Sequence, residues 1–95
     1  MKNDFETHEL LHDTHEFPCS YLFKAIGRDE EEFVPRVLAA VRSVLGEGIE
    51  PPFNLRRTSN KKHVSVSIEP TVNGPKQIFE IYETLKDVDG VLMLM

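Results

Sequence analysis

The spacing of apolar residues changes from a period of two to a helical period and back, and this order constrains the fold most. Residues 17–27 alternate aromatic and branched side chains, which predicts a strand whose odd positions face the core. A helix is expected next, because Asp29 and Glu32 form a capping-box pattern and Gly46 can end it. Pro35 must then lie within or just after the first helical turn. The apolar side chains of this helix recur at helical spacing: Phe33, Val37, Val41, Val44 and Leu45.

The second half of the chain repeats this change of period. Residues 53–59 and 62–71 predict two strands around a tight turn at Asn60 and Lys61, so that Ser59 pairs with Lys62. This register places two pairs on one face, Leu55 opposite Val66 and Arg57 opposite Val64. Pro75 suits the first position of a second helix that ends near Asp87, and a short strand follows Gly90.

The order strand, helix, strand, strand, helix, strand predicts an α+β fold of the ferredoxin-like βαββαβ type. Such a fold has a four-stranded antiparallel sheet in the order 4-1-3-2, with both helices on one face. We expect an acidic, histidine-containing arm at residues 1–16 and a single domain at residues 17–95. The expected core is Tyr21, Phe23, Val37, Val41, Val64, Val66, Ile68, Ile78, Ile81 and Leu85.

Composition excludes several classes of protein. A chain of 95 residues suits one domain, and it has neither a long apolar run nor the start of a signal peptide, so a cytoplasmic protein is expected. Its single cysteine, Cys19, cannot form an intramolecular disulfide and is too few for an iron–sulfur cluster. The 11 basic and 16 acidic residues give a net charge of −5, which argues against general affinity for nucleic acid or an anionic membrane.

Residues 10 to 95 resemble a known family. The segments that carry the resemblance are FPCSYLFKAIG, EFVPRVLAAVRSVLG, RRTSNKKHVSVSIEPTV and IYETLKDVDGVLMLM. They are similar to the YbeD-like family of unknown function, of the UPF0250 and DUF493 type, whose members are also called lipoate regulatory proteins. The resemblance implies a fold like that of ACT regulatory domains and a link to lipoate metabolism. Residues 1–9 lie outside it.

An ACT-like fold also implies pairing of subunits and a small-ligand site near the turn after the first strand. The matching positions here are Gly27, Arg28 and Asp29. Gly27 would let the backbone approach a ligand, Arg28 could pair with a carboxylate such as lipoate, and the start of the helix offers free N–H groups. Asp29 and the following glutamates compete for those groups, so weak binding at most is expected.

No enzyme signature is visible in the sequence. The loop after the first strand is too short to cradle a phosphate, paired cysteines are missing, and the strand from Lys62 to Glu69 has no aromatic residue to stack on RNA bases. No nucleophile and base, or carboxylate pair, is placed together. We therefore expect no catalytic residue and no cofactor.

A basic cluster lies in the predicted hairpin. It consists of Arg56, Arg57, Lys61 and Lys62 beside His63. Such a cluster could hold a phosphate or an acidic partner. The simpler interpretation is an edge hairpin whose charge resists aggregation, with only Arg56 on the open face and Arg57 along the edge of the core.

Histidines in the arm have a spacing that suits a metal. His8, His12 and His15 would share one helical face, and Asp13 or Glu16 could complete the ligand set. Solvated surface histidines are the favoured interpretation, because nothing in the sequence fixes a second shell of residues around them. No metal site is therefore predicted, and Cys19 is interpreted as an inert thiol.

The predicted open side of the sheet, opposite the helices, carries apolar residues. These are Leu22, Ile26, Leu92 and Leu94, on the adjacent first and last strands. A contiguous exposed apolar patch usually marks an interface. It would be covered by a second copy, by a partner protein, or by the Leu10 and Leu11 segment of the arm. We expect a non-enzymatic regulatory or interaction module, with homodimerisation expected. The alternative is nucleic-acid or phosphate binding through residues 56–63.

Overall fold

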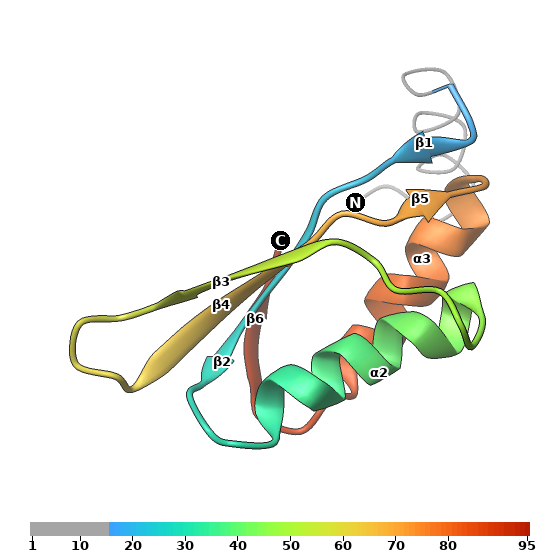
Figure 1. Cartoon of the computed structure of the whole chain (residues 1–95). Helices are drawn as coiled ribbons and strands as arrows, with labels where there is room; N and C mark the ends of the chain where they lie inside the picture. Colours follow the sequence, from blue (N-terminus) through green and yellow to red (C-terminus); the bar gives the residue numbers. More distant parts are fainter. Residues whose placement is uncertain (1–15) are drawn as a thin grey trace, which may run out of the picture.

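Two helices cover one side of a four-stranded antiparallel sheet in the computed structural model, which describes residues 16–95 (Figure 1). The strand order, β3-β4-β2-β6, is the expected order 4-1-3-2, so the predicted ferredoxin-like topology is confirmed. The strands are β2 (Phe23–Arg28), β3 (Phe53–Arg57), β4 (His63–Ile68) and β6 (Val91–Leu94). The arm at residues 1–15 lies outside the described residues, together with its histidines and Leu10 and Leu11.

Two of the predicted strands are interrupted. Instead of one strand over 17–27, β1 (Cys19–Ser20) precedes β2, and instead of one strand over 62–71, β5 (Thr71–Val72) follows β4. β1 and β5 pair with each other in a separate two-stranded antiparallel sheet. Pro70 explains the break, because it has no N–H to donate to a ladder, although its carbonyl oxygen accepts a hydrogen bond of 3.0 Å from the Tyr21 N–H.

The first described helix, α2 (Phe33–Leu45), begins without the predicted capping box. Glu32 is its N-cap residue and makes no side-chain capping bond. The Asp29 carboxylate instead accepts a hydrogen bond of 3.0 Å from Nε of Arg57 in β3. Pro35 lies in the first turn as expected, and Gly46 ends the helix with a φ of 112°. A charged partner 28 residues away has therefore replaced the local cap.

The second described helix, α3 (Pro75–Lys86), has the predicted bounds. Pro75 occupies a first-turn position, where its missing N–H costs nothing, and Asp87 is the C-cap residue. The Asn73 N–H donates to the side-chain oxygen of Gln77 over 2.8 Å, which stabilises the entry to the helix.

The β3–β4 hairpin has the predicted register but not the predicted turn. Leu55 lies opposite Val66 and Arg57 opposite Val64. Ser59 and Lys62 do not extend this ladder, because the Thr58 hydroxyl donates to the side-chain oxygen of Asn60 over 2.7 Å. The same hydroxyl accepts a bond from the His63 N–H. These side-chain bonds replace ladder bonds, and Lys61 takes the left-handed conformation that the longer loop needs, with φ 59°.

The core lies between the sheet and the two helices. Nine of the ten expected core residues are buried, and Tyr21 is half-buried at the edge of the cluster. Ala25, Phe33 and Val72 complete the core from β2, α2 and β5. These branched and aromatic side chains are buried on the face of the sheet that the helices cover. The other face has no covering layer among the described residues.

The register of β6 corrects one prediction. Ala25 pairs with Leu94 and Ile26 with Met93, but Gly27 pairs with Val91, so Leu92 is an extra residue in a β-bulge. Leu94 therefore lies on the helix side and is half-buried, not on the open side as predicted. A bulge shifts every following residue to the other face of the sheet.

Candidate functional site

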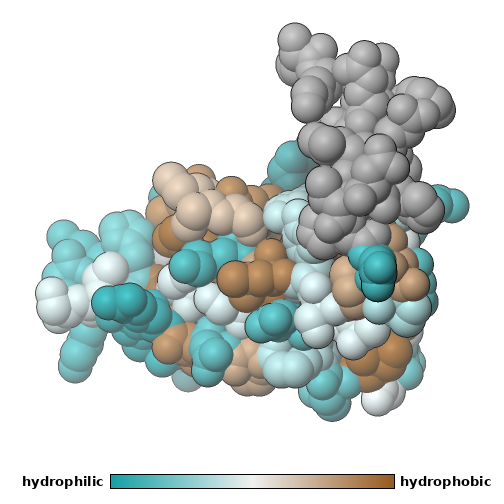
Figure 2. All heavy atoms as spheres, turned by 90° about the horizontal axis from the view of Figure 1, so that it is seen from above, coloured by the Kyte–Doolittle hydropathy of each residue, from teal (hydrophilic) through white to brown (hydrophobic). Residues whose placement is uncertain are grey.

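The side of the sheet that faces away from the helices is not covered by another layer of the described residues, and we call it the open face (Figure 2). Its members are identified by strand alternation from the buried positions of β2 and β4. The open face consists of Leu22, Lys24, Ile26, Arg28, Asn54, Arg56, Thr58, His63, Ser65, Ser67, Leu92, Met93 and Met95.

Positive charge on the open face is not neutralised locally. Lys24, Arg28 and Arg56 make no salt bridge with any residue in the range 16–95. No member of the open face is Asp or Glu, although the chain carries 16 acidic residues and a net charge of −5. The first carboxylate on this side, Glu69, follows the end of β4 next to Leu22. The open face is therefore a locally electropositive surface on an acidic protein.

Apolar side chains flank the basic ones. Leu22, Leu92, Met93 and Met95 are 53%, 53%, 55% and 52% exposed. Met93 lies opposite Ile26, and Met95 exchanges two backbone hydrogen bonds of 2.8 Å with Lys24. The predicted apolar strip is thus present, with Met93 and Met95 in the place that had been expected for Leu94.

A shallow hollow of about 450 Å³ lies where the open face meets the hairpin. Arg56 lies opposite Ser65, and Ser65 lies opposite Ile26 on the next strand. A guanidinium, a hydroxyl and an apolar side chain therefore line this hollow in one cross-strand row. Such a row can bind a carboxylate and a neighbouring apolar side chain at the same time.

The basic hairpin cluster divides between two sides of the sheet. Arg56 lies on the open face, as predicted, and His63 lies there opposite Arg28. Arg57 lies on the helix side, where its salt bridge with Asp29 uses its charge. Lys61 and Lys62 lie in the turn, exposed. The five residues therefore do not form one binding surface.

The turn after β2 is occupied by packing contacts. Gly27 is buried, and a Cβ atom at this position would fall on the Phe33 ring and 2.5 Å from the Gly90 carbonyl oxygen. Its missing side chain therefore makes room for Phe33 and not for a ligand. The Asp29 N–H donates to the Lys62 carbonyl oxygen over 2.9 Å. Of the three predicted ligand residues, only Arg28 has a polar side chain without a salt bridge to the part of the chain that the structure describes.

A second hollow, of about 390 Å³, lies between this turn and the hairpin tip. Arg28, Lys61 and Lys62 line it, but so do Asp29 and Glu30. The N–H groups of α2 begin only at Phe33, which lies beyond this lining. The mixed charge disfavours a small anionic ligand at this position.

An aromatic cluster joins β2 to α3 on the helix side. The rings of Phe23 and Tyr82 lie 4.9 Å apart in an edge contact, and Tyr21 lies 5.0 Å from Phe23. Burial raises the pKa of Tyr82 to about 12, with a smaller contribution from the neighbouring Tyr21. Because this group lies in the packing between β2 and α3, we assign it to the fold and not to the open face.

Within residues 16–95, no group of three or more His, Cys, Asp or Glu side chains is arranged to hold a metal ion. The predicted histidine triad, His8, His12 and His15, lies outside this range, and Cys19 is half-buried in β1. Neither of the described helices has the length and apolarity needed to cross a bilayer.

The sequence pattern alone did not lead us to predict that basic and apolar residues together form a binding surface on one face. Lys24 was expected on this side of the strand with Leu22 and Ile26 but was not taken as part of a binding surface, and Arg28 was assigned to the ligand turn, although it occupies an even position in the same strand. This alternation was the signal that could have revealed them. Met93 and Met95 carried no such signal, because the bulge in β6 decides which face they occupy.

The architecture and the uncovered sheet face define an ACT-like α+β domain. The structure is similar to the ACT domain of a GTP pyrophosphokinase from Chlorobium tepidum, with a TM-score of 0.57, 10% identity, and coverage of 81% of this chain and 97% of that one. It is also similar to the solution structure of protein HP0495 from H. pylori, with a TM-score of 0.62, 19% identity and 85% coverage of both chains. These similarities concern the fold.

The chain belongs to the family described as Protein of unknown function (DUF493), which matches residues 12–95. A UPF0250 protein of Shewanella amazonensis is 33% identical over 76 residues, which cover 80% of this chain and 84% of the relative. A UPF0250 protein of Pasteurella multocida is 29% identical over 85 residues, which cover 90% and 94%. The predicted family resemblance is therefore confirmed.

Proposed function

We propose that this protein is a non-enzymatic interaction module whose open face binds an acidic, partly apolar segment of another protein. The observation that carries the proposal is the composition of the open face. It has three cations without a salt bridge to any residue in the range 16–95, a strip of half-exposed apolar side chains, and on this side only the Glu69 carboxylate, just beyond the end of β4. Acidic groups would pair with the cations, and apolar groups would cover Leu22, Met93 and Met95.

Charge argues against self-association through this surface. Two open faces in contact would bring Lys24, Arg28 and Arg56 of each copy close to the same cations of the other. Like charges in an interface cost free energy that a small apolar strip does not offset. We therefore assign the open face to a different molecule.

A regulatory role is the form of interaction that we favour. The similar ACT domain belongs to a GTP pyrophosphokinase, which supports the role of a domain that acts on an enzyme. In the present protein that enzyme would be a separate chain. An enzyme of lipoate metabolism is the first partner to test, since members of the similar family are also called lipoate regulatory proteins.

Binding of nucleic acid or phosphate through residues 56–63 is the second candidate. Arg56, Lys61 and Lys62 favour it, since they form no salt bridge with any residue from 16 to 95. Arg57, however, is engaged by Asp29, and none of the members of the open face is aromatic, so bases would find no stacking surface.

Binding to defined peptides tests the proposal. We expect a fluorescent peptide of alternating Glu and Leu to bind, and one of alternating Lys and Leu not to bind. Arg56→Glu should weaken binding about tenfold or more, since it replaces an attraction with a repulsion. Lys76→Glu, on α3, changes net charge equally and serves as the matched control.

Three results would contradict the proposal. The first is that the Glu–Leu peptide does not bind. The second is that Arg56→Glu and Lys76→Glu weaken peptide binding equally. The third is that single-stranded oligothymidylate binds more tightly than the peptide at physiological salt. The last result would favour the nucleic-acid alternative.

A further inference from the structure

The N-terminal arm, residues 1–15, is complementary in composition to the open face. It has four carboxylate side chains and one lysine, and its apolar side chains include Phe5, Leu10 and Leu11. The open face combines the opposite charge with a strip of half-exposed apolar side chains. The chain therefore carries within itself a segment whose chemistry fits its own open face.

The arm joins the fold beside the apolar end of this face. It leads into β1, and only Tyr21 and Leu22 separate β1 from β2. Leu22 is therefore the member of the open face nearest to the arm along the chain. Met95 adds to this apolar end, because it exchanges backbone hydrogen bonds with Lys24. Figure 1 shows β1 beyond the end of β2, with β5 between β1 and α3 in this view.

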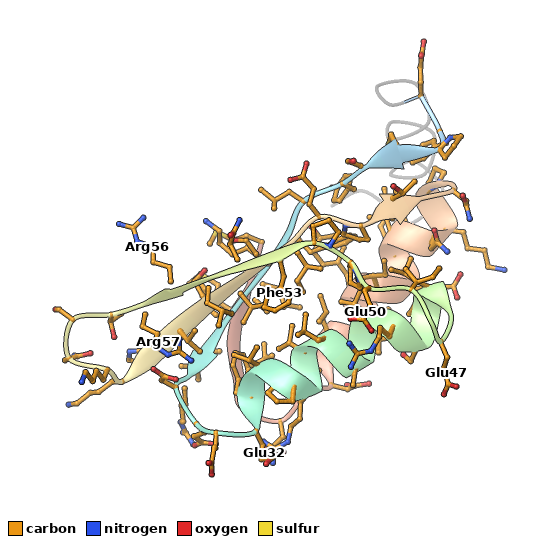
Figure 3. All side chains as sticks on the ribbon, in the orientation of Figure 1. Glu32, Glu47, Glu50, Phe53, Arg56 and Arg57 are labelled. Carbon is orange, nitrogen blue, oxygen red and sulfur yellow. The ribbon has the colours of Figure 1, made fainter. Side chains whose placement is uncertain are left out.

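The arginines of the open face lie farther from the arm. Arg28 is at the other end of β2, and Arg56 belongs to the row of Ile26, because both lie opposite Ser65. Figure 3 shows Arg56 directed away from the helices, so an arm on this side can reach its guanidinium. The open face is therefore apolar where the arm begins and basic at a distance from it.

The arm has the same order of chemistry. Counted back from Glu16, beyond Asp13, two leucines are followed by three carboxylates: Leu11, Leu10, Glu9, Glu6 and Asp4. If the chain reverses direction near Glu16, the leucines meet the apolar end of the open face and the carboxylates meet its cations. Glu69, the carboxylate next to Leu22, then faces the leucines and not the acidic part of the arm.

Chain length permits this arrangement. Leu10 and Leu22 are each six residues from Glu16. The chain from Leu22 to Arg28 extends about 20 Å at about 3.3 Å per residue. The same number of residues separates Leu10 from Asp4, and an extended chain of that length spans at most about 21 Å. The arm is therefore long enough to reach from the apolar end to Arg28.

We propose that residues 1–15 dock on the open face of their own chain. An acidic arm avoids the repulsion between like charges that argues against contact of two open faces. Attachment to the same chain gives the arm an effective concentration on the order of millimolar, so a weak contact keeps it docked. A partner's acidic segment must then displace the arm before it binds. That consequence rests on the proposed function, whereas the docking itself is measured without a partner.

A spin label on the arm tests the docking in the whole chain. The variant Thr7→Cys with Cys19→Ala carries a nitroxide only at position 7, and the label broadens the amide signals of nearby residues. We expect the greatest loss of signal at Lys24, Ile26 and Met93. Circular dichroism verifies that the variant is folded.

Charge reversal in the arm provides the matched comparison. Glu6→Lys with Glu9→Lys should restore the broadened signals, because it replaces an attraction with a repulsion. Glu47→Lys with Glu80→Lys, at exposed positions outside the open face, changes the net charge equally and should leave the loss of signal in place. Without any label, only the arm variant should shift the amide signals of the open face, so the test does not depend on the cysteine substitutions.

The Glu–Leu peptide separates this inference from the proposed function. If the arm covers the open face about nine-tenths of the time, Glu6→Lys with Glu9→Lys should bind the peptide about tenfold more tightly than wild type. Equal peptide binding by both would overturn the docking and leave the proposed function in place. No peptide binding, together with broadening at the open face, would contradict the proposed function and support the docking.

Three other results would overturn the docking. The first is a loss of signal confined to α2 and α3, and the second is an equal loss with and without the charge reversal in the arm. The third is broadening of a copy without the label, in a mixture with labelled chain, as strong as within the labelled chain. That result would mean that the arm binds a second copy.

Discussion

The structure indicates directly how much unfolding free energy the substitution Gly27→Ala would remove. The added Cβ would collide with the Phe33 ring and lie 2.5 Å from the Gly90 carbonyl oxygen. Phe33 is fully buried, and the Gly90 oxygen accepts a 3.3 Å bond from the Arg28 N–H, so neither neighbour is free to retreat. Overpacking of this kind costs about 3 kcal/mol of unfolding free energy, the upper part of its range.

For a domain of this size, such a loss lowers Tm by about 10–20 °C, measurable by thermal and urea unfolding followed by circular dichroism. Gly74→Ala is the matched control, because Gly74 has extended backbone with φ 177° and no atom within 4 Å of the added Cβ. Because Gly74 is the N-cap residue of α3, the alanine variant should lose no more than about 1 kcal/mol of unfolding free energy. The double variant Gly27→Ala with Phe33→Leu should lose less unfolding free energy than the sum of the losses in the two single variants.

Equal stability of Gly27→Ala and Gly74→Ala would refute this reasoning. It would mean that the space above Gly27 is open, as a ligand site at this turn requires. Additive effects of Gly27→Ala and Phe33→Leu would likewise show that the Phe33 ring does not fill that space.

Three further results are expected. The pKa of Tyr82 is raised to about 12, so its neutral form stabilises the fold fully below pH 10, and this stabilisation is lost as the pH rises from 10 to 12. In an absorbance titration, Tyr82→Phe should remove a tyrosine ionisation that wild type shows near pH 12, and a Tyr82 ionisation near pH 10 would contradict this prediction. Leu94→Glu should lower Tm more than Met93→Glu, because Leu94 packs against the core and Met93 is 55% exposed; the opposite order would show that the register is wrong. Calorimetry with lipoate should detect weak binding or none, and submicromolar binding lost in Arg28→Ala would contradict the mixed charge assigned to that hollow.

Regular alternation explains what could be predicted. Val64 and Val66 face the core because strand positions alternate, and Leu55 and Arg57 follow from the same register across the hairpin. The topology then follows from the order of elements. These predictions depend only on the pattern within one strand or on the pairing of strands that are neighbours in the sequence.

The errors arise where distant residues or irregular backbone decide the outcome. Asp29 does not cap the helix as predicted, because its carboxylate accepts a hydrogen bond from Arg57, which is distant in sequence but adjacent in the fold. Leu94 lies on the helix side and not on the predicted open side, because β6 contains one extra residue in a bulge. The spacing of apolar residues in the sequence cannot locate such a bulge. The basic character of the open face depends on Lys24 and Arg28 in β2 and Arg56 in β3, and these two strands lie on either side of β4 only after folding.

The central claim is that the open face binds an acidic, partly apolar segment, and an amide chemical-shift map tests it most directly. Labelled protein would be titrated with the Glu–Leu peptide, with the Lys–Leu peptide as control. We predict that the largest shifts fall on Lys24, Ile26, Arg56 and Ser65, and that Arg56→Glu removes them. Shifts confined to α2 and α3, or no shifts at all, would contradict the account.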